Sequence, residues 1–375
     1  MAATRVALIG YQFMGKVHSH AYRTVAHFFP EIEKPEMKVL CGRNESAVKS
    51  AAAQYGWQEH ATSWVDVLKR DDIDLVDVST PGDSHRPIAI AAAQAGKAVF
   101  CEKPLANTLT EAKEMLAAVE EAKVPNMVAF NYRRVPAISF ARQLIQSGRL
   151  GRIYHFRARY LQDWIMDPEF PLVWRLQADK AGSGPHGDLN AHIVDVARYL
   201  VGEITSVSGL TETFIKERPL PDGKGRGKVT VDDAALFLAR FESGAVGSFE
   251  ATRFAGGRKN HMTFEINGEK ASLSFNLERL NELELWDAED GTTQGFRDIL
   301  VTEGDHPYIA AWWPPGHIIG YEHTFTHEVR DLLECLQTGQ TPAPSFRDGV
   351  ACQAVLEAVL DSVAKKSWVE VPKLG

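Results

Sequence analysis

The fold is decided by the first strand-like run of the chain and the turn that follows it: residues 5–15 read Arg-Val-Ala-Leu-Ile-Gly-Tyr-Gln-Phe-Met-Gly. The apolar run Arg5–Ile9 is typical of a buried strand, and apolar residues at helical spacing follow from about residue 14 to residue 27. Gly10 permits a tight turn, and Gly15 lets helix and strand approach closely. A helix that begins here presents free N–H groups to a pyrophosphate. The stretch predicts either a dinucleotide-binding turn, with Gln12 in place of the middle glycine, or an ordinary strand–helix connection.

The same alternation of strand and helix continues to about residue 130. Further strands are expected at Met37–Cys41, Asp74–Ser79, Ala98–Cys101 and Asn126–Phe130, and helices at Glu45–Tyr55, Ser84–Ala95 and Thr110–Ala122. Short apolar strands separated by helices of this length indicate βαβ units and a parallel sheet covered on both faces. We therefore expect residues 1–130 to form an α/β domain.

The pattern changes after Asn131, where alternating strands and tight turns replace the βαβ units. Strands are expected at Arg152–Gln162, Asp233–Phe241, Ala245–Thr252, Met262–Ile266, Ala271–Phe275 and Glu282–Trp286, and helices near Val135–Ser147, Gly187–Val201, Tyr321–Gln337 and Arg347–Lys365. Glu242-Ser243-Gly244 and Asn267-Gly268-Glu269 have the composition of hairpin turns. Residues 131–375 are expected to form an α+β domain with a largely antiparallel, open sheet. Pro221–Val229 is expected to be a mobile surface loop, and His306–Gly320 a long loop.

Composition narrows the class of protein. The 375 residues are enough for two domains, and 45% of them are hydrophobic. A formal charge of −8 gives no general attraction to phosphate backbones or anionic lipid, so we expect neither a nucleic-acid nor a membrane partner. The four cysteines form no CxxC pair, and the chain shows neither a signal peptide nor a long apolar run. These features indicate a cytoplasmic protein.

Two short segments at expected strand ends carry candidate ligand-binding residues. Ser79, Thr80 and Pro81 end one strand, with His85 a few residues beyond, and Glu102-Lys103-Pro104 ends the next. The carboxyl ends of parallel strands are where open α/β sheets bind ligands. Because the proline restricts the backbone of Lys103, we expect this lysine to be held in a defined direction.

The end of the second strand bears on the choice of cofactor. NAD-selective sites commonly place an acid there to bind the ribose hydroxyls, whereas arginine accommodates a 2′-phosphate. Here residue 42 is a glycine and not an acid, and Arg43 follows it. Arg43 is either a cofactor residue or a solvated surface charge, so both NAD and NADP are admitted.

One expected helix brings a carboxylate and an imidazole together. Asp188 and His192 are four residues apart and project from one helix face. A carboxylate beside an imidazole fixes its orientation and suits it to act as a general base. Three interpretations remain open: a helix cap with a core histidine, a metal site that includes His186, or an acid–base pair facing a substrate. The sequence offers no clear further metal ligand, and we expect no metal.

Taken together, these motifs resemble the glucose–fructose oxidoreductase/inositol dehydrogenase/MocA (Gfo/Idh/MocA) family over essentially the whole chain. The resemblance rests on Gly10–Gly15, Thr80-Pro81 with His85, Glu102-Lys103-Pro104, Asn131-Tyr132-Arg133-Arg134, Trp174-Arg175, and Asp188 with His192. Three further runs, Phe13–Lys16, Leu161–Trp164 and Gly182–Gly184, resemble one member of the family in particular. Gln12 departs from the three-glycine turn of the family.

The resemblance implies an N-terminal Rossmann domain, a nicotinamide cofactor between the two domains, and an open sheet that forms an oligomer interface. It implies catalytic roles for Lys103, Asp188 and His192. The residues expected to bind NAD or NADP are Gly10, Phe13, Met14, Gly15, Arg43, Ser79, Thr80, Pro81, His85, Glu102, Lys103, Asn131, Arg133, Trp174 and Arg175. The residues expected to contact substrate are Lys103, Tyr132, Gln162, Asp188 and His192.

The function that these features favour is an NAD(P)-dependent dehydrogenase acting on a secondary hydroxyl of a cyclic sugar, anhydrosugar or polyol. Three alternatives remain: inositol dehydrogenase, glycoside cleavage through transient oxidation, and a non-catalytic nicotinamide-binding sensor. A helical layer on one side of an open sheet leaves another face to be covered, so we also expect a homodimer or homotetramer.

Overall fold

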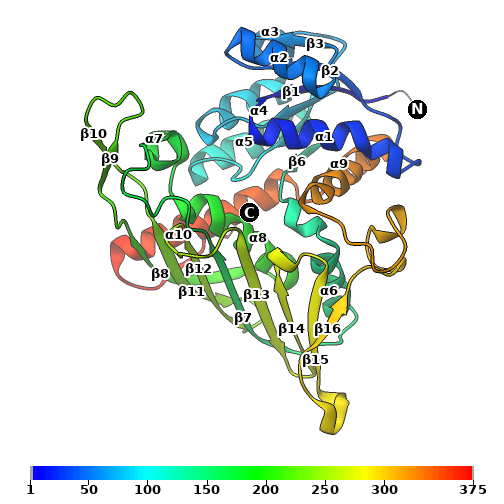
Figure 1. The fold of residues 1–375 in the computed structure, drawn as a ribbon, viewed down its shortest axis with the longest axis vertical. Helices are drawn as coiled ribbons and strands as arrows, with labels where there is room; N and C mark the ends of the chain where they lie inside the picture. The colour runs from blue at the N-terminus through cyan, green and yellow to red at the C-terminus, as the bar shows by residue number, and fades with distance from the viewer. Residues whose placement is uncertain (1–2, 374–375) are drawn as a thin grey trace. The chain divides into compact units, whose positions relative to one another are not determined.

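The computed structural model describes residues 3–373 and consists of two compact units (Figure 1). The first comprises the chain up to Arg134 together with Gly320–Val350, and the second comprises Val135–Ile319 and the chain from Ala351 on. The expected division at residue 130 stays a prediction, but Gly320–Val350 groups in space with the first unit.

The first unit contains a six-stranded sheet in which every neighbouring pair is parallel. The strand order is β3-β2-β1-β4-β5-β6, which is the doubly wound arrangement of a Rossmann fold. The strands are β1 (Arg5–Ile9), β2 (Glu36–Cys41), β3 (Glu59–Ala61), β4 (Leu75–Val78), β5 (Ala98–Cys101) and β6 (Asn126–Val128). The helices are α1 (Phe13–Phe28), α2 (Glu45–Tyr55), α3 (Trp64–Leu68), α4 (His85–Gln94), α5 (Leu109–Ala122) and α9 (Tyr321–Thr338). The predicted parallel sheet is confirmed.

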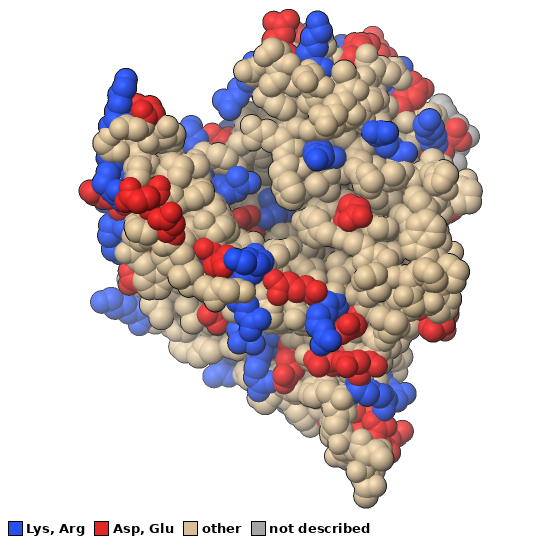
Figure 2. Space-filling model, viewed as in Figure 1, with Lys and Arg blue, Asp and Glu red and all other residues tan. Residues whose placement is uncertain are grey.

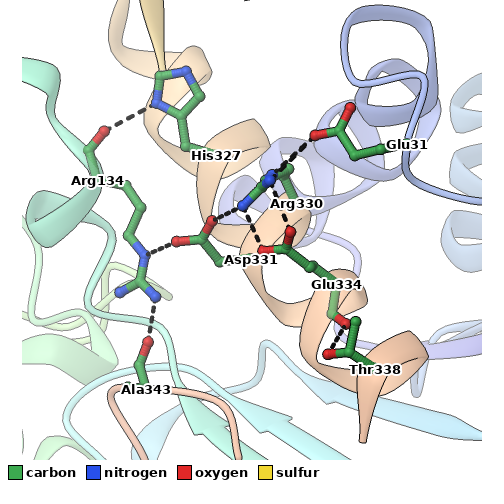
Figure 3. A network of polar contacts seen from close by, with 8 residues as sticks. All are labelled: Glu31, Arg134, His327, Arg330, Asp331, Glu334, Thr338 and Ala343. Carbon is green, nitrogen blue, oxygen red and sulfur yellow. Dashed lines mark hydrogen bonds and ion pairs between the residues drawn. The ribbon is translucent and has the colours of Figure 1, made fainter. Parts of the chain in front are cut away.

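A polar network fastens α9 and the segment after it to the rest of the first unit (Figure 3). His327 Nδ1 donates a hydrogen bond to the Arg134 carbonyl at 2.9 Å, and Arg134 bonds the Ala343 carbonyl and pairs with Asp331. Arg330 pairs with Glu31, just beyond α1. Because α9 also packs along α1, this C-terminal segment is part of the helical layer of the first unit.

The second unit contains a nine-stranded sheet in the order β16-β15-β14-β13-β7-β12-β11-β8-β17. Only β7 and β12 pair in parallel, so the predicted largely antiparallel sheet is confirmed. Its strands are β7 (Ile153–Leu161), β8 (Ile204–Glu212), β11 (Ala234–Phe241), β12 (Val246–Thr252), β13 (His261–Gly268), β14 (Ala271–Asn276), β15 (Glu282–Asp287), β16 (Arg297–Leu300) and β17 (Val369–Glu370). Its helices are α6 (Pro136–Gln146), α7 (Ala178–Ala181), α8 (Ala191–Leu200) and α10 (Phe346–Lys365), the last from Ala351 on.

The two faces of this sheet differ in their cover. Helices α6 and α8 pack on one face (Figure 1). Inward side chains such as Phe156 and Phe249 are fully or almost fully buried. On the other face, β11 exposes Leu236 and Leu238 to solvent at 38% and 54%. The alternation of buried and exposed residues along β11 follows from the two-residue period of a strand.

The prediction that Pro221–Val229 is a mobile surface loop is wrong for its second half. Strand β10 (Arg226–Lys228) pairs antiparallel with β9 (Glu217–Pro219), so only the tip between them is a turn. The reason is burial: Arg218 is fully buried and donates to the carbonyls of Ile165 and Asp167, while Val229 joins a small apolar cluster.

Charge and hydropathy of the described chain add two observations. On the face drawn in Figure 2, basic and acidic side chains are interspersed. Within residues 3–373, no helix is both long and apolar enough to cross a membrane.

Candidate active site

The glycine turn after β1 has the geometry that a dinucleotide requires. Gly10 has a φ of +114°, and a Cβ there would lie 2.4 Å from the Ser79 carbonyl oxygen. A Cβ on Gly15 would lie 2.1 Å from the Gly10 carbonyl oxygen. Both positions therefore admit only glycine, and the close approach of α1 to β1 depends on them.

The N-terminus of α1 is open to a ligand. Gln12 occupies the N-cap position, and no side chain among residues 3–373 caps the first turn. Phe13 is 61% exposed, so the helix begins at the surface of its unit. Uncapped N–H groups at a helix start form an anion site that suits the pyrophosphate of a dinucleotide. Gln12, which stands where the family has a middle glycine, accepts the Lys16 N–H at 2.8 Å through its carbonyl and so starts the helix.

The end of β2 has no space for an acidic side chain. A Cβ on Gly42 would lie 2.2 Å from the ring of Tyr11, so an acidic side chain here would require that ring to move. Arg43 is exposed directly beside it.

A buried histidine bridges the carboxyl ends of β4 and β5. His18 Nδ1 lies 2.8 Å from Asp77 Oδ2, and His18 Nε2 lies 3.1 Å from Glu102 Oε1. Burial by itself lowers the pKa of His18, but the two carboxylates outweigh it and hold the pKa well above its usual range. The other oxygen of Glu102 accepts the backbone N–H of Lys103 at 3.0 Å. His18 therefore fixes the segment from which Lys103 projects.

A second buried histidine connects the two loops that follow β4 and β5. His85 Nε2 lies 2.8 Å from the Thr80 carbonyl oxygen, and Nδ1 lies 3.0 Å from the Pro104 carbonyl oxygen. The side chain is 1% exposed. His85 thus connects the loop of Thr80 and Pro81 to the segment that follows Lys103.

Asn131, Tyr132 and Arg133 form a buried 3₁₀ turn after β6. Asn131 Nδ2 donates to Thr324 Oγ1 at 2.9 Å, and Arg133 pairs with Asp348 at 3.4 Å. These contacts show how the residues are anchored within the first unit.

In the second unit, a π-helical turn carries Asp188, and the helix that follows it carries His192. The helix expected over Gly187–Val201 is a π-helical turn, His186–Asn190, followed by α8. Asp232 holds its start by accepting the N–H groups of Gly184 at 2.7 Å and His186 at 2.9 Å. A Cβ on Gly184 would lie 1.9 Å from the Asp232 carbonyl oxygen, so only glycine fits. Such π-helical turns occur often at functional sites.

His186 is a supporting residue of this turn. Its Nε2 donates to the Leu356 carbonyl at 2.8 Å, and its Nδ1 accepts from Asn190 at 3.1 Å. Burial lowers its pKa, in keeping with a neutral ring. Both nitrogens are engaged, so His186 does not act as a metal ligand, and residues 3–373 contain no cluster of three or more His, Cys, Asp or Glu side chains placed to hold a metal ion.

Asp188 has a partner that the sequence did not indicate. Arg253 Nη2 lies 2.5 Å from Asp188 Oδ2, and the guanidinium lies 5.1 Å from the centre of the Trp164 ring. Arg175 stacks on Trp174 at 4.3 Å and interacts electrostatically with Asp188. Burial lowers the pKa of Arg175, and Asp188 opposes that effect.

A chain of contacts surrounds His192 and Gln162. The rings of Tyr160 and His192 lie 5.9 Å apart, and Tyr160 donates to Asn260 Oδ1 at 2.7 Å. Gln162 donates to the same oxygen at 3.2 Å and accepts from Trp164 Nε1 at 2.9 Å. The second unit thus gathers Gln162, Asp188 and His192 in one polar neighbourhood. Tyr160, Asn260 and Arg253 belong to that neighbourhood and were missed, because nothing in their local sequence marks them.

The comparisons with known proteins agree with this geometry. Residues 4–130 match the family described as "Oxidoreductase family, NAD-binding Rossmann fold", and residues 138–274 match the GFO/IDH/MocA C-terminal domain. The chain belongs to the Gfo/Idh/MocA family of oxidoreductases and has its NAD-binding Rossmann domain. The resemblance drawn from the sequence motifs is confirmed.

Individual relatives extend over the full chain. Levoglucosan dehydrogenase of Pseudarthrobacter phenanthrenivorans is 44% identical, with 100% of both chains covered. The structure of levoglucosan dehydrogenase in complex with NADH and levoglucosan has a TM-score of 0.97 and covers 100% of both chains. An oxidoreductase domain protein from Kribbella flavida is 55% identical, with a TM-score of 0.96 and the same coverage. The particular member that Phe13–Lys16, Leu161–Trp164 and Gly182–Gly184 resemble is levoglucosan dehydrogenase.

Proposed function

We propose that the protein is an NAD(P)-dependent dehydrogenase that oxidises a secondary hydroxyl of a cyclic sugar, anhydrosugar or related polyol. The observation that carries the proposal is the full-length similarity to levoglucosan dehydrogenase, whose structure with NADH and levoglucosan matches this chain at a TM-score of 0.97. D-apiose dehydrogenase of Paraburkholderia graminis, 28% identical over 98% of this chain, supports the same class of substrate.

The residues of the first unit fit a dinucleotide. The Gly10–Gly15 turn and the start of α1 would hold the pyrophosphate, and Arg43 would lie toward the adenosine ribose. Ser79, Thr80, Pro81, Glu102 and Asn131 at the strand ends would support the nicotinamide half, with Arg133, Trp174 and Arg175 as further cofactor residues. When bound, the nicotinamide accepts the hydride together with its electron pair.

The chain's own residues would handle the proton. As the carbonyl forms, the substrate hydroxyl must lose its proton, and imidazole titrates nearest to neutral pH. We therefore assign His192 as the general base and Lys103 as the group that hydrogen-bonds the reacting oxygen and relays or shares the proton. Asp188 would orient the imidazole of His192, and Tyr132 and Gln162 would contact the sugar. The proton then passes to water, which balances the oxidation.

The proposal includes the organisation of the protein. Residues 1–130 would form the NAD(P)-binding domain, with Gly320–Val350 packed onto it, and residues 131–375 the substrate and oligomerisation domain. The open face of the nine-stranded sheet supports a homodimer or homotetramer. We place the enzyme in the cytoplasm, in line with its unpaired cysteines.

A substrate screen tests the proposal. Purified protein is incubated with anhydrosugars, monosaccharides, glycosides and inositols, each with NAD and with NADP, and reduced nicotinamide is followed by absorbance. We expect sustained reduction with at least one anhydrosugar or sugar and recovery of an intact oxidised ring. Cleaved glycoside without net reduction would indicate transient oxidation instead, and binding without turnover would indicate a sensor.

Substitution of Lys103 tests the assignment of residues. Lys103→Met is expected to lower turnover by roughly 10²–10⁴-fold while cofactor binding stays measurable. Lys113→Met, an exposed lysine on α5, is the matched control and is expected to keep full activity. His192→Asn is expected to lower the rate and flatten its dependence between about pH 6 and 8. Near-normal turnover of Lys103→Met would contradict the assignment.

A further inference from the structure

The ion pair between Asp188 and Arg253 joins a proposed active-site residue to one with no assigned role. Asp188 comes from the π-helical turn His186–Asn190, and Arg253 directly follows β12. Arg253 Nη2 and Asp188 Oδ2 are 2.5 Å apart. The arginine side chain is 1% exposed, whereas the aspartate side chain is 36% exposed. The pair therefore reaches from the interior of the second unit to a position accessible to a ligand.

Arg253 is fixed in the interior on several sides. Its backbone N–H donates to the Asp233 carbonyl at 3.2 Å, and its guanidinium lies over the Trp164 ring. Its Nε and Nη1 atoms have no hydrogen-bond partner among residues 3–373. A buried guanidinium stays charged, so it needs the negative charge of Asp188 nearby. Breaking the pair would leave one buried, uncompensated charge.

The other charged groups near Asp188 are a second arginine and a buried aspartate whose oxygens accept backbone hydrogen bonds. Arg175 adds a second positive charge that interacts with Asp188. Asp232 is nine-tenths buried beneath the turn, where its two oxygens accept the N–H groups of Gly184 and His186. His186 is neutral and bonded on both ring nitrogens, and His192 lies one turn further along. Two guanidinium groups thus outweigh the remaining acid near Asp188.

We propose that Arg253 is a positioning residue of the reaction: its ion pair holds the Asp188 carboxylate in one place and in its charged form. Asp188 then accepts hydrogen bonds from the site throughout the reaction and does not take the substrate proton. That proton goes to His192 or Lys103 and from there to water. This inference rests on the proposed dehydrogenase function. It adds Arg253 to the residues that support the reaction, and it limits Asp188 to accepting hydrogen bonds.

The pH profile of kcat/KM distinguishes this role from simple packing. In Arg253→Met the carboxyl loses this cation, so protonation of Asp188 is expected to add to that of His192, which steepens the acid limb of the profile and moves it to higher pH. Arg253→Lys keeps a positive charge and is expected to keep the limb near its wild-type position. The double variant Arg253→Met/Asp188→Asn is expected to show no more displacement than Asp188→Asn alone. Arg258→Met, an exposed arginine further along the same loop, is the matched control.

Two results would overturn the inference. One is an Arg253→Met profile that is lowered equally at every pH. The other is a double variant in which the two effects simply add, since a shared ion pair requires coupling. Binding of NADH, followed by its fluorescence, shows whether each variant is folded.

A titration that does not depend on turnover separates this inference from the proposed function. Carbon NMR of protein labelled at the aspartate carboxyl groups follows Asp188 in the wild type, with Asp188→Asn for assignment. We expect Asp188 to stay ionised to lower pH than Asp179, which is 70% exposed. A higher midpoint for Asp188 would refute the ion-pair role even if the enzyme is active. If no sugar supports turnover but Asp188 titrates low, the proposed function fails while the ion pair stands.

Discussion

At the scale of single residues, the space around Gly42 explains why the cofactor preference is open. The Tyr11 ring fills the position beside β2, so an acid at residue 42 would require the ring to move. Arg43 is the nearest charged side chain after the strand, and it suits a 2′-phosphate better than free ribose hydroxyls. We therefore expect only modest discrimination against NADP.

Arg43→Ala tests the predicted role of Arg43 in binding NADP. The variant is expected to lose more affinity for NADP than for NAD, because only NADP carries a 2′-phosphate that the guanidinium can bind. Dissociation constants measured by protein fluorescence for both reduced cofactors give the comparison. Lys49→Ala on α2 removes a similar exposed charge and should change neither. Equal losses for both cofactors in Arg43→Ala would mark it as a general surface charge.

Glu328 on α9 is a buried carboxyl group whose oxygens have no hydrogen-bond partner among the described residues. Burial raises its pKa well above 4.5; Arg134 and His18 oppose that effect, and Glu102 and Asp77 add to it. The folded protein therefore keeps a proton that the unfolded chain releases as pH rises above 4.5. The contribution of this group to stability is present at low pH and is lost as pH rises toward the raised value.

Glu328→Gln should remove that dependence. The amide cannot ionise, so the variant is expected to gain more free energy of unfolding relative to wild type at pH 8 than at pH 5. Urea unfolding at both pH values, followed by circular dichroism, measures the difference. Glu334→Gln is the control: it loses a partly exposed pair with Arg330, expected to contribute no more than about 1 kcal/mol at either pH. An equal effect of Glu328→Gln at both pH values would show that Glu328 is ionised in the folded state.

At the scale of elements, the sequence predicts what depends on local pattern. Arg5–Ile9, Glu45–Tyr55 and Ala98–Cys101 have the predicted bounds, because apolar periodicity marks a buried strand or an amphipathic helix. Strand β3 is three residues long and mostly exposed, so it leaves no such pattern. Strand β10 was missed because Arg218 holds the hairpin through contacts with residues about 50 positions away.

The candidate site shows the same difference between residues in local sequence motifs and residues joined by long-range contacts. Gly10, Gly15, Lys103, Asp188 and His192 stand in short motifs that a single sequence reveals. Arg253 lies 65 residues from Asp188 along the chain, and their contact depends on how β12 passes the π-helical turn. The turn itself was predicted as ordinary helix, since Asp232 imposes its shape from outside the segment.

Gly184 is the residue on which the π-helical turn depends, so Gly184→Ala tests the element. The added Cβ would meet the Asp232 carbonyl oxygen at 1.9 Å, and neither backbone segment can move without breaking the Asp232 bonds. We expect a loss of about 1–3 kcal/mol in the free energy of unfolding and a larger fall in kcat than in cofactor affinity. Gly187→Ala is the control, because its Cβ would meet only the Ser183 hydroxyl, which can rotate away. A stable, fully active Gly184→Ala would contradict the rigid turn.

At the scale of the whole molecule, the open face of the nine-stranded sheet requires an explanation. Leu236 on β11 lies directly opposite Leu210 on β8, and both are exposed. Further along β11, Leu238 lies opposite Ser248 of β12, and Arg240 lies opposite Val246 of the same strand. A shallow groove on this face is lined by Leu238, Arg240, Val246, His155 and Trp368. Exposed apolar side chains that alternate with charges are typical of a surface that another subunit covers.

Leu238→Glu is expected to break the proposed assembly. Leu238 is 54% exposed and central on β11, so a carboxylate there costs the isolated unit little but would be buried without a partner in a face-to-face contact. Light scattering coupled to size exclusion at micromolar concentration should show wild type at two or four times the chain mass and the variant at lower mass. Val65→Glu on α3, which replaces a similarly exposed apolar residue in the first unit, should leave the mass unchanged. If wild type itself runs as a monomer, the open face serves some purpose other than self-association. If Leu238→Glu assembles like wild type, the subunits meet through another surface.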